Sequence, residues 1–108
     1  MIDLDGEHPR AIAHVTVGDA PEGLAISPKG NLAAALNVDG SNMKQAWFHH
    51  PNGSVTILGI QGKTVTPVET IEVGNFPEPM AFSPDGQYLY VGNYADQDFS
   101  ILKVDGTK

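Results

Sequence analysis

The sequence predicts an all-β protein, and three observations carry this prediction. Short apolar runs recur along the chain with turn-forming residues between them, and the 108 residues include twelve Gly and eight Pro. No stretch shows the 3.6-residue periodicity of an amphipathic helix. The stretch AFSPDGQYLYVGN at 81–93 is also a near-copy of AISPKGNLAAALN at 25–37, which indicates an internal repeat.

The repeat has a defined period. Residues 17–37 align with 73–93 at a spacing of 56, whereas 54–63 align with 98–107 at a spacing of 44. The difference of 12 residues is an insertion in the first copy, centred on MKQAWFHHPN at 43–52. A basic period of about 44 residues is typical of one four-stranded antiparallel blade of a β-propeller.

The repeat assigns four strands, A to D, to each complete unit. Strand A is followed by Ser-Pro-Lys-Gly or Ser-Pro-Asp-Gly, which fits a type I turn with Ser first, Pro second and Gly fourth. Many strands are apolar on both sides, as expected for sheets buried on both faces. The predicted strands are A at 24–27 and 80–83, B at 32–37 and 88–93, C at 54–60 and 98–104, and D at 13–17 and 69–73.

These strands divide the chain into three parts and predict about two and a half blades of an incomplete ring. Residues 1–17 are assigned strands C and D of one blade, because MIDLDG aligns with the strand endings ILGIQG and ILKVDG. Residues 18–73 are expected to form a complete blade with the insertion. Residues 74–108 are expected to form strands A, B and C of a partial blade.

Two assemblies agree with this division, since propellers close with about four to eight blades. We expect a segment of a longer protein of about seven blades. The alternative is a subunit that closes a ring with copies of itself, although the extra strand C at residues 1–6 would then compete with residues 99–104 for one place. In both cases exposed sheet faces and unpaired strand edges predict self-association.

The phrases VG-x-x-P-x-x-x-A-[IF]-S-P-x-G and YVGN resemble the YVTN family of β-propeller repeats, over nearly the whole chain apart from residues 43–52. The second copy is the better match, because the first has AAALN where the family tends to have a Tyr-Val pair. The resemblance implies a propeller similar to those of surface-layer proteins, 6-phosphogluconolactonase and carboxymuconate cyclase. It also implies a periplasmic or extracellular location.

Composition weighs against several functional classes. The formal charge of −7 and the lack of a basic cluster argue against nucleic-acid binding. No apolar run reaches the roughly 18–20 residues that span a bilayer, and MIDLDGEHPR lacks the features of a signal peptide. The chain has no Cys, so neither a disulfide nor a thiolate metal site is expected, and no cofactor is predicted.

The insertion holds the main candidate for ligand binding. In a propeller the D–A and B–C loops share one face, so the insertion, which is a B–C loop, is expected on that face. Its aromatic rings and hydrogen-bonding groups suit a sugar, lactone or peptide. The alternative is that the aromatic residues pin the loop to the sheet while the histidines are solvated. The candidate residues are Lys44, Trp47, Phe48, His49 and His50.

A second candidate is the cluster of Asn93, Asp96 and Asp98 in the other B–C loop, whose oxygen atoms suit a hard cation. A tight turn capped by Asp and Asn side chains explains the same pattern. Asn37 and Asn93 also end equivalent B strands, which favours a structural role for both.

No catalytic residue is predicted, so we expect a non-catalytic segment for protein or ligand interaction or for scaffolding. The alternative is part of a lactone hydrolase or cyclase. That chemistry needs an acid or base and, for a phosphosugar, cationic anchors. Only Lys44, together with His49 or His50, is expected on the face where such a site would lie.

Overall fold

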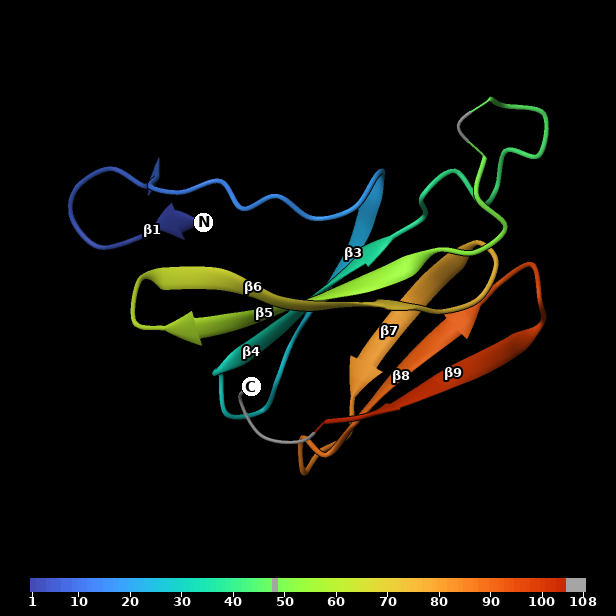
Figure 1. The fold of residues 1–108 in the computed structure, drawn as a ribbon. Coiled ribbons are helices and arrows are strands. Elements are labelled where there is room, and N and C mark those ends of the chain that lie inside the picture. The colour runs from blue at the N-terminus through green and yellow to red at the C-terminus, as the bar shows by residue number, and fades with distance from the viewer. Residues whose placement is uncertain (48, 105–108) are drawn as a thin grey trace.

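The computed structural model describes residues 1–47 and 49–104, and every regular element in them is a β-strand. The strands form three antiparallel sheets of two, four and three strands (Figure 1), so the all-β prediction is confirmed. Within the described residues, no helix has the length and apolar character needed to cross a bilayer. In chain order the strands are β1 (Ile2–Asp3), β2 (Arg10–Ala11), β3 (Pro21–Ile26), β4 (Leu32–Asn37), β5 (Ser54–Gln61), β6 (Thr64–Glu72), β7 (Pro77–Phe82), β8 (Tyr88–Asn93) and β9 (Asp98–Lys103).

The sequence repeat is reproduced in the backbone. β7 and β8 begin and end 56 residues after β3 and β4, and β9 begins 44 residues after β5. The predicted turns are present, because Gly30 N donates to Ser27 O and Gly86 N donates to Ser83 O, both at 2.9 Å. Both glycines have a φ of +74°, which a residue without a Cβ adopts at little cost.

β2 differs from its predicted bounds of 13–17. Its partner β1 has two residues, and the ladder pairs Ile2 with Ala11 and Asp3 with Arg10. After Ala11 the chain runs on to β3 without entering a further ladder. The strand is therefore placed by its short partner rather than by its own apolar pattern.

β6 is longer than predicted, since it begins at Thr64 rather than at residue 69. Pro67 lies inside it, opposite Leu58, where the register with β5 shifts. A proline is tolerated here because β6 is an edge strand of its sheet, and an edge strand can spare an amide.

The two larger sheets pack against each other and enclose the core. Ala34 and Leu36 of β4 share one cluster with Leu89 and Val91 of β8, and all four are fully excluded from solvent. Side chains alternate along a strand, so Tyr90 lies on the opposite face of β8 and is exposed. The cluster also contains Val55 and Val73, with Ile57, Met80, Phe82, Leu102 and Val104 packed against it.

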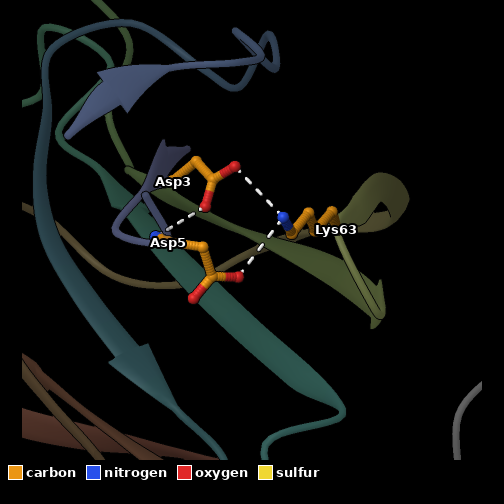
Figure 2. Close-up of polar contacts among 3 residues, drawn as sticks. All are labelled: Asp3, Asp5 and Lys63. Carbon is orange, nitrogen blue, oxygen red and sulfur yellow. Dashed lines mark hydrogen bonds and ion pairs between the residues drawn. The ribbon is translucent and has the colours of Figure 1, made fainter. Parts of the chain in front are cut away.

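An ion pair ties the β1–β2 turn to the β5–β6 turn (Figure 2). Lys63 Nζ lies 3.1 Å from Asp3 Oδ2 and 3.4 Å from Asp5 Oδ2. The amide of Asp5 donates to Asp3 Oδ1, and this bond together with Lys63 lowers the pKa of the Asp3 carboxyl. The hydrogen bonds to Asp3 and Asp5 raise the pKa of Lys63.

Candidate functional site

The loops that carry both candidate sites lie at one edge of the two larger sheets. They precede β3 and β7 and follow β4 and β8, and antiparallel pairing brings these strand ends together. In Figure 1 this edge is toward the upper right, and the Ser-Pro-x-Gly turns lie at the opposite edge. We call residues 18–20, 38–53, 73–76 and 94–97 the loop edge.

Asn93, the last residue of β8, joins β8 to β9 and to the loop that precedes β7. Its Nδ2 donates to Asp98 Oδ1 and to Ser100 Oγ, both 2.9 Å away. Its Oδ1 accepts from the amide of Gly74 at 2.8 Å. The side chain is almost fully buried, so these bonds replace water and give Asn93 a structural role.

Asn37 occupies the equivalent place at the end of β4, with one difference. Its Nδ2 donates to Ser54 Oγ at 3.2 Å and to Thr56 Oγ1 at 3.0 Å. Its Oδ1 is buried and lacks a hydrogen-bond partner among the residues the structure describes. Gly18 lies so close that an added Cβ would be 2.7 Å from Asn37 Cγ, so only glycine fits there.

A carboxylate in each of the two B–C loops holds the loop that precedes the same sheet. Asp39 Oδ1 accepts from the amide of Asp19, and Asp96 Oδ2 accepts from the amide of Asn75, both at 2.9 Å. Sequence alignment missed this pairing, because Asp39 follows its asparagine by two residues and Asp96 follows its own by three. The available signal was an acidic residue shortly after each strand-ending asparagine.

The insertion is anchored to the loop that precedes β7. Ser41 Oγ accepts from the amide of Phe76 at 2.8 Å and donates to Val38 O at 2.7 Å. Asn75 Nδ2 donates to the carbonyl oxygen of Pro51 at 2.9 Å. The base of the insertion is therefore joined to both larger sheets, which nothing in its own sequence indicated.

The candidate ligand-binding residues lie on the outer part of the insertion. Trp47 is 95% exposed, and Lys44 and His50 are also exposed. His49 is half-buried, and its Nδ1 lies 3.0 Å from a backbone carbonyl oxygen of the same loop. Phe48 lies outside the described residues. The exposed indole argues against the alternative in which Trp47 packs onto the sheet.

The three residues of the candidate cation site are all engaged in hydrogen bonds. Asp98 accepts from Asn93, and Asp96 accepts from the amide of Asn75. A cation would compete with these donors for the same oxygen atoms. Among residues 1–47 and 49–104, no three His, Cys, Asp or Glu side chains are arranged to hold a metal ion. The cation site stays a prediction.

Carboxylates dominate the charge of the loop edge. A cavity of about 330 Å³ lies between the loop before β3 and the start of the insertion, and Asp19 and Glu22 line it. Such a field favours cationic or neutral ligands over anionic ones. In the described part of this edge and at the adjoining strand ends, the charged Asp, Glu, Lys and Arg residues are Asp19, Glu22, Asp39, Lys44, Glu72, Glu78, Asp96 and Asp98.

No family model matches the sequence, and no curated protein matches it. Among solved structures, the chain is similar to the crystal structure of a functionally unknown protein from Desulfotomaculum acetoxidans DSM 771. The TM-score is 0.63 at 23% sequence identity, over 94% of this chain and 32% of the other. The likeness is one of fold, and the chain spans about a third of that protein's length.

Proposed function

We propose that this chain is a β-propeller segment of a longer protein, and that its insertion binds a protein or small-molecule ligand without catalysing a reaction. The exposed indole of Trp47 carries the proposal. It stands on a loop whose base is held by Ser41 and Asn75. A rigid aromatic ring on an anchored loop loses little conformational entropy when a ligand binds.

The sheet order supports the propeller part of the proposal. Strand counts of two, four and three follow the order C-D, A-B-C-D, A-B-C that the repeat predicts. Each of the larger sheets is an antiparallel meander, the form of a propeller blade. The similarity to about a third of a longer chain supports a segment of a larger protein.

Charge weighs against the lactone hydrolase or cyclase alternative. A phosphosugar site needs cationic groups, and Lys44 is the one Lys or Arg in the described part of the loop edge. Lys29 and Lys63 lie in turns at the opposite edge. A neutral saccharide or a peptide without excess negative charge is the ligand that this edge favours.

The test screens the protein on a glycan array and a peptide array, followed by calorimetry with the probe that binds best. We expect Trp47→Ala to abolish binding of that probe without changing the circular dichroism spectrum. Met43→Ala, at another exposed position of the loop, is the control that should retain binding. Unfolding of Trp47→Ala, or hydrolysis of a phosphorylated δ-lactone that His49→Ala removes, would contradict the proposal.

A further inference from the structure

We propose that the outer face of the β7-β8-β9 sheet is a docking surface for β3 of a second copy of this chain. The contact is head-to-tail, because each copy uses one surface to donate β3 and a different surface to accept it. The inference concerns the 108-residue chain by itself, because in a longer propeller the next blade would cover the same face. It involves neither Trp47 nor the insertion, so it stands or falls separately from the ligand-binding role.

The interface between the two larger sheets inside the chain is the template for this contact. β7 contributes Met80 and Phe82 to the shared core, and β5 contributes Val55 and Ile57. All four residues have equivalents in the other copy of the repeat. The equivalents of the β7 pair lie 56 residues earlier on β3, and those of the β5 pair lie 44 residues later on β9.

The equivalents are apolar and point to solvent. On β3, Leu24 is 69% exposed and Ile26 is 53% exposed. On β9, Phe99 is 68% exposed and Ile101 is 63% exposed. Two apolar pairs of the internal interface therefore recur on the surface of the same chain, whereas the β4 residues Ala34 and Leu36 correspond to Tyr90 and Gly92. Bringing them together between two copies would bury apolar side chains in the way the chain already buries their equivalents.

A proline and a cavity give a second match. Pro77 is fully buried, and its ring lies against Gly53, where an added Cβ would be 2.6 Å from the ring. The equivalent of Gly53 is Gln97, which lines a cavity of about 510 Å³ together with Phe99. The equivalent of Pro77 is Pro21, which is exposed. In the docked pair, Pro21 of one copy enters the cavity of the other.

Gln97 sets how closely the copies meet. It carries a side chain where Gly53 carries none, so Pro21 would lie farther from β9 than Pro77 lies from β5. Gln97→Gly restores the residue of the first copy and removes a Cβ from a position with a φ of +59°. We expect this variant to associate more strongly than the wild type.

β1 competes with docking. MIDLDG aligns with ILKVDG, so residues 1–3 are equivalent to residues 101–103 of β9. In the docked pair, residues 101–103 of the other copy would therefore lie beside β2, in the place that β1 occupies. The β1–β2 ladder has only two residue pairs, so β1 can be displaced. Deleting residues 1–6 should therefore strengthen association.

The test measures mass against concentration by sedimentation equilibrium. We expect the wild type to associate, and Leu24→Glu and Phe99→Glu each to weaken association at least tenfold. Each variant keeps one intact surface, so an equimolar mixture of the two should form dimers that neither forms alone. Val68→Glu, at an exposed apolar position on β6 and outside the contact, is the control that should not weaken association.

Three results would overturn the proposal. The first is a wild type that stays monomeric at every concentration reached. The second is a mixture no more associated than either variant, which would leave β3 without a binding partner surface. The third is a loss on Phe99→Glu but not on Leu24→Glu, which indicates a symmetric contact between two copies of this face instead of a head-to-tail one.

Discussion

The first copy of the repeat, β3 to β6, and the second copy, β7 to β9, have the same turns and strand-ending asparagines but different surroundings. Every residue of β4 is buried, whereas Tyr88 and Tyr90 of β8 are exposed. β4 lies inside the molecule, and β8 has the other sheet on one face only. Local sequence therefore builds the strand in both copies, and the neighbouring sheet decides what each side chain contributes to stability.

The largest difference between the copies is expected at Gly53 and its equivalent, Gln97. Gly53→Ala places a Cβ 2.5 Å from the carbonyl oxygen of Asn37 and 2.6 Å from Pro77. We expect this overpacking to lower the free energy of unfolding by about 3 kcal/mol. Gln97→Ala, where no sheet covers the position, should change it by no more than about 0.5 kcal/mol. Urea denaturation measures both, and equal losses would show that close packing against Pro77 of β7 does not make this position sensitive.

The next difference is expected between the two asparagines. Asn93→Ala leaves the amide of Gly74 and the partners of Nδ2 without their bonds, so we expect a loss of about 3 kcal/mol. Asn37→Ala removes two bonds and also an oxygen that has no partner among the described residues, so we expect about 1.5 kcal/mol. The same urea titrations measure both. A loss on Asn37→Ala as large as that on Asn93→Ala would show that the unpaired oxygen costs nothing.

The elements that sequence predicted well are those fixed by local chemistry. The Ser-Pro-x-Gly turns and both B strands have the predicted bounds, because the turn hydrogen bond and the extended backbone each depend on a few adjacent residues. β2 was misplaced because its position depends on β1. β6 was cut short because its predicted bounds were the counterpart of 13–17 at a spacing of 56, whereas its start is set by the turn that pairs Thr64 with Gln61 of β5.

The candidate site was less predictable, because its contacts join loops far apart in sequence. The aromatic insertion was visible in the repeat alignment. The bond from the amide of Phe76 to Ser41 was not, since it links residues 35 positions apart through backbone geometry. Likewise, Asp39 and Asp96 each accept a hydrogen bond from the loop before the same sheet, but they lie at different distances in sequence from the strand-ending asparagine. An alignment without gaps does not pair them.

A smaller difference between the two copies is how their Ser-Pro-x-Gly turns respond to low pH. Ser27 donates to the neutral Asn31 side chain at 3.0 Å, whereas Ser83 donates to the Asp85 carboxylate at 2.6 Å. The bond from Ser83, followed by that from the amide of Gln87, lowers the pKa of Asp85. A lowered pKa gives stability that is present above the ordinary value of 3.8 and is lost as pH falls through the folded value.

We therefore expect acid to loosen the β7–β8 turn before the β3–β4 turn. Hydrogen-exchange protection factors of the Tyr88 and Leu32 amides, which bond to the two serines, would measure this. Protection of Tyr88 should fall below pH 3.8 while that of Leu32 is retained. Asp85→Asn removes the carboxylate that titrates and should remove the difference. A parallel loss at both amides would contradict this cause.

The smallest effect is expected at the ion pair between Lys63 and Asp3 (Figure 2). The repeat does not include this lysine, because the equivalent residues are Glu7, at a spacing of 56, and Thr107, at a spacing of 44. The lowered pKa of Asp3 gives stability that is lost in acid below pH 3.8, and the raised pKa of Lys63 gives stability that is lost as pH rises above 10.5.

Lys63 is mostly exposed, so salt screens the pair, and Lys63→Gln should barely change the free energy of global unfolding. Within one copy of the chain, its effect should be confined to faster exchange of the Asp5 and Ile12 amides, with Lys29→Gln as the control. Because a loosened β1 is easier to displace, Lys63→Gln should also associate slightly more strongly, and weaker association would argue that β1 supports docking instead of opposing it.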